Sequence, residues 1–530
     1  MPTYLSPGVY VEEVSSGSKP IEGVGTAVGA FVGFTERGPL NEPVLVTNWT
    51  QFAQTFGESC PGGYLPQAVH GFFLNGGGSA YVVRIPHLEE EEPDSSGSGA
   101  RPRFARALLP AGTTGGRPAL SVRARMPGAQ GDVLGVEVVD ATERGDGLVK
   151  LLVKQHGKVA ETFDNVSLHK GPTHVVTVVN EGSKLVRVEQ LPEAAATEAS
   201  ATEASAVDRH AAPAAKLTGG TAAADRPARL TAQDFIGEAL ERTGIAGLEA
   251  VDDVTMLAVP DLMSAYERGW VDRDGVKAVQ AAVIAHCELM ADRVAILDTP
   301  PGLNALQVKN WRSDETGYDS KYATMYWPWL KVTDTDSGEP VLVPPSGHVA
   351  GVWARSDESR GVHKAPANEP LRGVIAPELS LTKGEHDQLN PIGLNCIRAF
   401  PGSGIRIWGA RTLSSDAAWR YLNVRRLFNY VEESILQGTN WVVFEPNDAK
   451  LWDSVKRTIT MFLRGVWRDG ALFGRTPEEA FFVKCDEENN PPESRDQGIL
   501  TVEVGIAAVK PAEFVVFRIS QFSDGTALDE

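Results

Sequence analysis

An α/β pattern that breaks off and later resumes constrains the fold of this chain more than any other feature. Buried apolar runs alternate with segments of helical spacing near the N-terminus, and the same pattern returns after about residue 230. The first half contains the predicted strand Thr26–Phe34, helices Trp49–Phe56 and Tyr64–Phe73, and strand Ala80–Ile85. The second half contains the predicted strand Val254–Val259, helix Gly275–Met290, and strands Arg293–Leu297 and Tyr322–Lys331. We therefore expect one discontinuous, mixed α/β core domain, made of residues 21–86 and 230–390.

The residues between these halves follow a different pattern. Residues 104–192 alternate apolar and polar side chains with period two, and turn residues separate about six such runs, including His174–Val179. On both sides the composition is that of a flexible linker, acidic and Ser/Gly-rich before the runs and rich in Ala, Thr and Ser at Glu193–Ala224. An Ala-rich helix is the alternative for the second linker, but Thr, Ser and Pro213 disfavour it. Residues 87–229 are thus predicted to be an inserted all-β domain with flexible linkers.

A C-terminal α+β domain, residues 391–510, is predicted from two amphipathic helices and a strand. The first helix is expected to start at Ser414 or Ser415 and to bury Trp419, Leu422, Leu427, Val431 and Ile435. The second is expected to start near Asn447-Asp448 and to bury Leu451, Trp452, Val455, Ile459, Phe462, Leu463 and Val466. Alternating apolar residues from Leu500 to Ile506 indicate the strand.

Both ends of the chain have the character of extended arms. Tyr4–Val14 within arm 1–20, and Phe514–Phe522 within arm 511–530, are short β-prone runs with too little apolar area to fold alone. An unpaired strand exposes N–H and C=O groups, so each arm must fold back or add to a sheet in another subunit. For the second case, the predicted inter-subunit strand residues are Val9, Tyr10, Val11, Phe514, Val516, Phe517 and Ile519.

Composition excludes several classes of protein. The net charge is −19, which argues against a general electrostatic footprint for nucleic acid. No uninterrupted apolar run is long enough for a transmembrane helix, and residues 1–10 lack the basic and apolar regions of a signal peptide. The four cysteines, Cys60, Cys287, Cys396 and Cys485, are far apart and form no zinc-binding spacing. We expect reduced thiols, no metal and no cofactor.

One motif suggests an enzyme. Ile296–Gly302, with the sequence ILDTPPG, resembles a strand end of some P-loop ATPases in which the Asp serves a magnesium ion. That chemistry also needs a phosphate-binding loop, and the chain contains no GxxxxGK[ST], GxSxG or HExxH. A strand end closed by a proline turn is the simpler interpretation, and a nucleotide-dependent enzyme remains the alternative function.

A basic stripe runs along the second C-terminal helix. It consists of Lys456, Arg457, Arg464 and Arg468, with Asp453 as its acidic neighbour. Positions 457, 464 and 468 share the face opposite the apolar one. Either this is an ordinary solvated face, or it docks an acidic partner.

Several blocks of the sequence resemble the contractile tail sheath family. Near the N-terminus these are SPGVYVEEV and VGFTERGP, the latter at Val32–Pro39. The longest block spans Leu389–Ile435 and is followed by WVVFEPND, DGALFGRTPEEAFFVKCD and PAEFVVFRI in the order of the family. Together the blocks cover about a third of the chain, whereas the predicted insertion matches none of them.

The resemblance implies a structural protein that is not an enzyme. Sheath subunits form rings of six or a six-start helix around an inner tube, and their terminal arms join neighbouring subunits into a mesh. The sheath assembles in a metastable extended state and contracts to drive the tube into a target. The C-terminal domain, including the basic helix, would face the tube, and insertions would point outward.

The partners implied are further copies of this chain, the inner tube protein, and baseplate and tail-terminator or cap proteins, without nucleic acid or membrane insertion. The location implied is the bacterial cytoplasm during assembly, or a phage tail or extracellular contractile particle.

Overall fold

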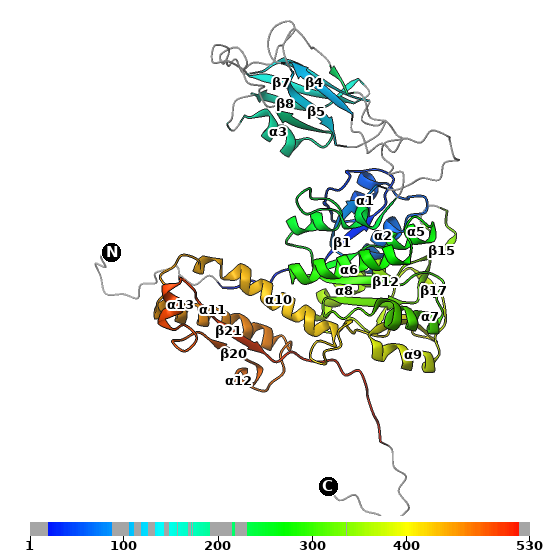
Figure 1. Ribbon diagram of the computed structural model, residues 1–530, viewed down its shortest axis with the longest axis vertical. Helices are drawn as coiled ribbons and strands as arrows, with labels where there is room; N and C mark the ends of the chain where they lie inside the picture. The colour runs from blue at the N-terminus through cyan, green and yellow to red at the C-terminus, as the bar shows by residue number, and fades with distance from the viewer. Residues whose placement is uncertain are drawn as a thin grey trace, which may run out of the picture.

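A nine-stranded sheet forms the centre of the molecule in the computed structural model (Figure 1). The structure describes residues 20–86, 105–110, 118–125, 133–142, 148–155, 157–167, 171, 173–190, 215–217, 230–334 and 337–518. The strand order is β16-β19-β18-β13-β12-β11-β1-β3-β2. Their bounds are β1 Val28–Gly33, β2 Val44–Val46, β3 Ser79–Arg84, β11 Met256–Ala258, β12 Val294–Asp298, β13 Ala323–Trp327, β16 Glu369–Pro370, β18 Leu394–Phe400 and β19 Gly404–Ile407.

The six inner strands are parallel, and the outer strands at both edges are antiparallel. Strand β1 lies between β3 and β11, which come from opposite sides of residues 87–229. The two predicted α/β stretches therefore share one sheet. Strands β18 and β19 belong to it as well, so the range 391–510 begins inside the sheet.

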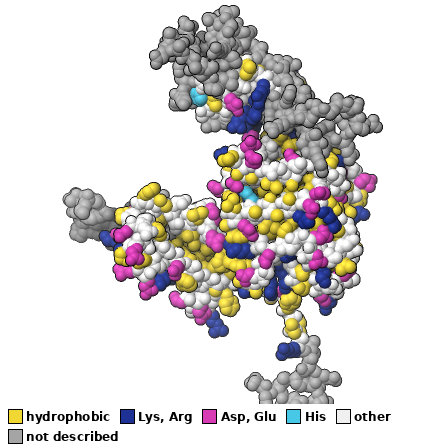
Figure 2. All heavy atoms as spheres, in the orientation of Figure 1, with side chains coloured by type: hydrophobic (Ala, Val, Ile, Leu, Met, Phe, Trp, Pro, Cys, Tyr) yellow, Lys and Arg dark blue, Asp and Glu magenta, His cyan; other side chains and the backbone are white. Residues whose placement is uncertain are grey.

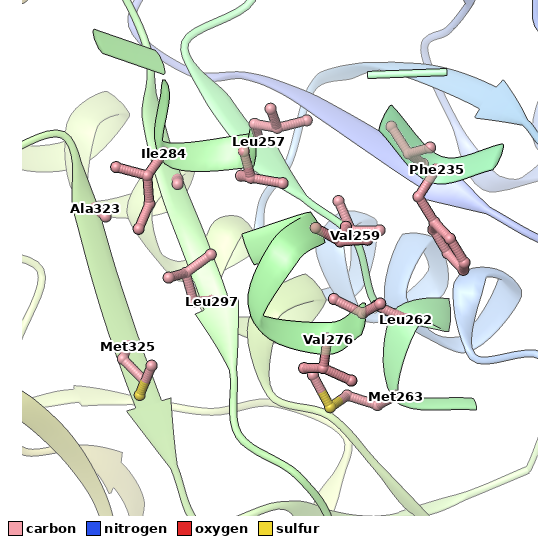
Figure 3. Close-up of a cluster of buried hydrophobic side chains, with 14 of the residues drawn as sticks. Phe235, Leu257, Val259, Leu262, Met263, Val276, Ile284, Leu297, Ala323 and Met325 are labelled. Atoms are coloured by element: carbon pink, nitrogen blue, oxygen red, sulfur yellow. The ribbon is translucent and has the colours of Figure 1, made fainter. Parts of the chain in front are cut away.

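One face of the sheet is covered by a group of helices whose apolar side chains form the largest buried cluster (Figure 3). Helix α6 contributes Ile284, which lies near Leu257, Leu297 and Ala323 of the strands, and Val276, which lies beside Met263 of α5. The helices of this face are α4 Ala232–Ile236, α5 Asp261–Glu267, α6 Arg273–Met290, α7 Ala305–Asn310 and α9 Lys383–Leu389.

The opposite face is covered by α1 Trp49–Phe56, α2 Leu65–Asn75 and α8 Ser346–Arg360. Asn48 caps α1 by accepting a hydrogen bond from the backbone N–H of Gln51. Gly76 ends α2 in the left-handed conformation that glycine adopts without strain. Both helices match their predicted ranges within two residues.

The predicted strand Tyr322–Lys331 is two strands. β13 ends at Trp327, and β14 Leu330–Thr333 joins a small antiparallel sheet with β15 Pro340–Val343 and β17 Val374–Pro377. The chain changes sheets at Pro328, which has no backbone N–H to donate to the first ladder.

The described part of residues 105–217 holds two antiparallel sheets around their own core. The strands are β4 Arg106–Pro110, β5 Pro118–Ala124, β6 Leu134–Asp140, β7 Val149–Gln155, β8 Lys158–Val166, β9 Val186–Gln190 and β10 Ala215–Lys216. Strand β10 pairs with β6 inside the second predicted linker, so the expectation of a flexible segment is wrong at residues 215–217. The rest of that linker and residues 87–104 lie outside the described residues.

The predicted strand His174–Val179 is wrong, because Val175–Gly182 forms helix α3. Val175 and Val179, one helical turn apart, are both buried in the core of the two sheets. The Asn180 side chain holds the helix to β9 by donating to the Val188 carbonyl and accepting from its N–H. These tertiary contacts outweigh the β-propensity of a valine-rich run.

The C-terminal part is built around two long helices, α10 Leu422–Gly438 and α11 Ala449–Arg468. Helix α10 starts seven or eight residues later than expected, since Arg420 and Tyr421 pair with residues 411–412 in extended conformation. Trp419 consequently precedes the helix and is half-buried. Helix α11 starts as predicted, with Asp448 as its cap. The remaining elements are α12 Pro477–Ala480, β20 Phe481–Lys484, α13 Pro492–Asp496 and β21 Glu503–Ile506.

All four cysteines are buried, and none of them forms a disulfide. Within the described ranges, no helix combines the length and the apolar character needed to cross a membrane.

Candidate assembly surfaces

The C-terminal arm is fastened at its root by Glu513. Its carboxylate accepts hydrogen bonds from the Arg411 guanidinium at 2.6 and 2.8 Å, from Asn390 at 2.8 Å and from the Tyr421 hydroxyl at 3.1 Å. Burial alone would raise the pKa of Glu513, but Arg411 and Asn390 outweigh it and lower the pKa. The carboxylate therefore stays charged and anchors the arm to the core.

Beyond Glu513 the arm leaves the body of the protein. Phe514, Val515, Val516 and Phe517 are between 69% and 83% exposed, and Figure 2 shows hydrophobic side chains on this segment. The predicted strand is not formed in the single chain, since residues 511–518 belong to no strand. Ile519 lies outside the described residues. Four consecutive exposed apolar side chains on an unpaired backbone are a candidate surface for another chain.

The root of the N-terminal arm lies along α10 (Figure 1). Ile21 packs so closely on Gly438 that a Cβ there would lie 2.6 Å from Ile21, and Gly23 lies against Tyr430 in the same way. The Val24 N–H donates to the Ser434 hydroxyl at 3.2 Å. The predicted strand residues Val9, Tyr10 and Val11 lie outside the described residues.

The two arm roots are attached to opposite ends of α10. Tyr421, which precedes the first residue of the helix, contacts Glu513 of the C-terminal arm. Gly438, the last residue, contacts Ile21, which directly follows arm 1–20 and belongs to the root of that arm. A helix of 17 residues is about 25 Å long, so α10 fixes the separation of the two arm roots.

A two-stranded antiparallel sheet, β20 and β21, lies beside α11 and has exposed apolar side chains. Phe482 of β20 and Val504 of β21 are exposed, as is the nearby Phe473. In the described part of the chain the two strands form a sheet with each other alone. The stability of a two-stranded sheet is marginal by itself and increases when further strands are added.

The predicted basic residues of α11 are exposed. Lys456, Arg457, Arg464 and Arg468 all face solvent, and no ion pair to them is present among the described residues. The pKa of the nearby Glu478 carboxyl is lowered, chiefly by hydrogen bonds within its own turn. Arg464 adds a smaller lowering effect through its charge.

Sequence reasoning missed an apolar member of this face. Met461 is 62% exposed and lies four residues after Arg457 and three before Arg464, so it is at the centre of the stripe. An exposed flexible side chain among cations suits a docking surface better than a purely solvated face.

The ILDTPPG motif has a structural role at Asp298. This carboxylate is buried and accepts hydrogen bonds from the backbone N–H and the hydroxyl of Ser346 at 2.9 and 2.5 Å, at the start of α8. Burial raises the pKa of Asp298 to about 7, against the lowering effect of Ser346. The carboxylate thus caps a helix at a site closed to solvent. No cluster of potential metal ligands occurs in the described ranges.

Two family models match adjoining parts of the chain. The model described as phage tail sheath protein central domain matches residues 263–413, and that described as phage tail sheath C-terminal domain matches residues 414–522. The tail sheath protein of Burkholderia phage BcepMu is 26% identical over 96% of this chain and 95% of its own length. A putative prophage major tail sheath protein of Pseudomonas aeruginosa is 26% identical over 46% of this chain and 62% of its own.

Solved structures share the fold over nearly the whole chain. The sheath complex of an extracellular contractile injection system, PVC, in the contracted state matches with a TM-score of 0.57 at 22% identity, covering 98% of this chain and 99% of that one. The helical sheath of the anti-feeding prophage in its contracted state matches with a TM-score of 0.56 at 22% identity, covering 98% and 100%.

Proposed function

We propose, from the premise that this chain belongs to the contractile tail sheath family, that it polymerises around an inner tube and contracts to propel that tube. The observation that carries the proposal is the pair of arm roots at the two ends of α10. Each root is tightly held, and the described part of the C-terminal arm continues into exposed apolar chain. Such a subunit is built to contact two neighbours through segments that leave its body.

The arms would add strands to sheets of neighbouring subunits. The two-stranded sheet β20–β21 is the natural acceptor, since it carries exposed apolar side chains. Addition of a strand supplies main-chain hydrogen bonds, and pockets for alternate side chains set the register. Head-to-tail addition of this kind yields an open helical polymer.

The exposed face of α11 is our proposed contact with the inner tube. Arg457, Arg464 and Arg468 would meet carboxylates of the tube, with Met461 providing an apolar centre. Charges of this kind determine orientation and partner choice, whereas the apolar centre adds affinity. The C-terminal part from α10 onward, residues 422–510, would then lie inside the sheath, and the insertion 87–229 outside.

The further partners we propose are baseplate and terminator or cap proteins, with assembly in the bacterial cytoplasm. Contraction requires two packings of the same subunits separated by a barrier. Arms that reach from fixed roots into neighbouring subunits would keep the subunits joined while these move past one another. The energy for contraction would be stored in these interfaces and would not come from a nucleotide. This agrees with the structural role of Asp298 in the ILDTPPG motif, where the carboxylate accepts a hydrogen bond from Ser346.

Sedimentation tests this function. The full chain should pellet as polymer, and chains lacking residues 1–14 or 514–530 should stay in the supernatant as folded monomers, since the second truncation keeps Glu513 on Arg411. Polymers formed equally well by both truncated chains would contradict the mesh.

A further inference from the structure

A rigid turn carries a fully exposed leucine between two carboxylates. Leu240 is 100% exposed, and Glu238 and Glu241 flank it in an exposed turn. Gly237 and Gly244 close the turn with positive φ angles of 69° and 55°, and a Cβ on Gly237 would lie 2.0 Å from a backbone oxygen. Glycine is therefore required at this neck. We call residues 238–241 the acidic knob.

The acidic knob is stiffened by its own hydrogen bonds. The Glu238 N–H donates to the Thr243 hydroxyl at 2.9 Å, and the Thr243 N–H donates back to the Glu238 carbonyl at 3.1 Å. Arg242 follows Glu241 and is exposed as well, so the turn carries two carboxylates and one cation. A Cβ on Gly247 would lie 2.7 Å from the Arg242 backbone. A large apolar side chain held rigidly in water by a built turn contributes nothing to the core of its own chain.

A basic groove lies elsewhere on the same chain. It is a hollow of about 900 Å³ between the root of the C-terminal arm and the core, large enough for several side chains. Its apolar lining includes Trp408, Ala365, Ala367, Pro391, Ala410 and Val509 and, from the C-terminal arm, Pro511, Ala512, Phe514 and Val515. The cations around it are Arg360, Lys364, Lys383, Arg398, Arg411 and Lys510. His363 and His386 also line the groove, and burial lowers the pKa of each ring.

Cations outnumber the carboxylates of this groove. The groove has two acidic residues, Glu513 and Asp387. Glu513 is paired with Arg411, so Asp387 is the one remaining carboxylate that faces the other cations. Lys364 is paired with Glu369. For Lys383, Arg398 and Lys510, no ion pair is present within the described ranges. The groove therefore combines an apolar floor with an excess of positive charge.

The acidic knob and the basic groove lie at opposite ends of the nine-stranded sheet. Gly244 is tied to Asn41, whose N–H bonds to Arg84 at the end of β3. The groove uses Asn368, just before β16, and Trp408, just after β19. Six strand spacings separate β3 from β19, which is roughly 30 Å. The knob of one chain cannot fill the groove of the same chain.

We propose that the acidic knob of one copy docks in the basic groove of the next copy. Leu240 enters the apolar floor, and Glu238 and Glu241 meet the surrounding cations. Because the two surfaces differ and lie at opposite ends of the subunit, the contact is heterologous and repeats from copy to copy. It joins the body of one copy to the core and the C-terminal arm root of the next, in addition to the arm mesh, and it rests on the proposed polymeric function.

Cross-linking in trans tests the contact. One full-length variant carries Leu240→Cys, and a second carries a cysteine in place of Ala365, Ala367 or Ala512 around the groove. The variants are mixed, polymerised and treated with a short bismaleimide. The four native cysteines are buried, so the wild-type chain measures the background level of cross-linking. Leu436→Cys, exposed on α10, replaces the groove cysteine in the matched control.

Charge reversal gives an independent readout. Glu238→Lys with Glu241→Lys should raise the protein concentration needed for polymerisation about tenfold or more. Adding Lys383→Glu and Lys510→Glu should bring this concentration a large part of the way back to the wild-type value. Glu493→Lys, exposed on α13, is the control and should leave the concentration unchanged.

The expected result is a covalent dimer with the groove cysteines and none with the Leu436→Cys control. We also expect the compensating charge reversals in the groove to restore polymerisation of the knob variant. Polymers that give no knob–groove dimer, or that cross-link equally to the control, would overturn the contact and leave the sheath function standing. A wild-type chain that forms no polymer would contradict the proposed function itself.

Discussion

Arg426 of α10 and Asp357 of α8 form a buried, two-pronged ion pair at the junction of the C-terminal part and the core. The guanidinium nitrogens lie 2.5 and 2.9 Å from the carboxylate oxygens, and the two side chains are 3% and 4% exposed. Thr26 donates its hydroxyl to Asp357 and accepts from Arg426 through its carbonyl. The pair thus joins both parts of the molecule and the N-terminal arm root.

Removing one member of this pair should be strongly destabilising. Arg426→Met leaves the Asp357 carboxylate buried with one hydroxyl donor, so we expect a loss of about 3–5 kcal/mol in the free energy of unfolding. Urea denaturation followed by tryptophan fluorescence measures this loss, and Trp353, whose ring centroid lies 4.8 Å from the guanidinium, is one of the eleven tryptophans that report it. Lys484→Met, in an exposed pair with Glu488, should change stability little. Equal effects of both substitutions would contradict the account of this junction.

The exposed apolar run of the C-terminal arm should be needed for polymers and dispensable for folding. Replacing Phe514, Val516 and Phe517 by Ser removes side chains that contact solvent in the single chain. We expect an unchanged unfolding midpoint and loss of pelletable polymer. The matched control is Leu436→Ser, an exposed apolar residue outside the arms. Normal polymerisation of the arm variant would refute a role for this run.

The basic face of α11 should be required for assembly on the tube. Arg457→Glu with Arg464→Glu reverses two exposed charges without touching the buried face. Tube-dependent assembly should weaken by about tenfold or more, and the loss should shrink at high salt because screening weakens the wild-type contact as well. Arg475→Glu, exposed outside the helix, serves as the control. Assembly that is insensitive to the paired reversal would exclude this face as the dock.

Met461→Ala should weaken tube binding with little effect on its salt dependence. The side chain is exposed, so its truncation changes apolar contact and leaves the charges in place. Binding of the tube protein at two salt concentrations measures both quantities. No change in affinity would mean that Met461 lies outside the interface.

The buried Asp298 should make stability depend on pH. Its pKa is raised to about 7 in the folded chain, against about 3.9 in an unfolded one. Between these values the folded state binds the proton and the unfolded state does not, so this contribution to stability rises as pH falls from about 7 to 4. Its slope approaches about 1.4 kcal/mol per pH unit.

Asp298→Asn removes the titration and keeps an acceptor for Ser346. Unfolding in urea at pH 7.5, 6 and 5 should show the wild-type chain gaining stability relative to the variant as pH falls. Parallel curves for the two chains would show that the carboxyl does not titrate in this range.

The long periodic helices were predictable because local signals agree with tertiary packing. In α11 the apolar spacing, the Asp448 cap and the buried side chains all indicate the same element. Two misses have tertiary causes. The β-prone run at Val175 and Val179 forms a helix because both side chains are buried in the core on the same helical face. Helix α10 begins later than predicted because Tyr421 pairs with Arg411 in extended conformation.

The candidate surfaces were only partly predictable. The cations of α11 and the apolar run of the C-terminal arm are visible as sequence patterns. The anchors of the arms are not, because Arg411 and Glu513 lie 102 positions apart and Ile21 meets Gly438 at the far end of a helix. Contacts between distant residues of ordinary type leave no periodic signal.

Electron microscopy of the polymer assembled with its tube tests the central claim most directly. A contractile sheath must exist in two helical packings of the same folded subunit. We predict striated tubes of two kinds, long and narrow before triggering and short and wide after it, with subunits joined by arms in both. A polymer with a single diameter and length under all conditions, or with no arm connections between subunits, would contradict the account.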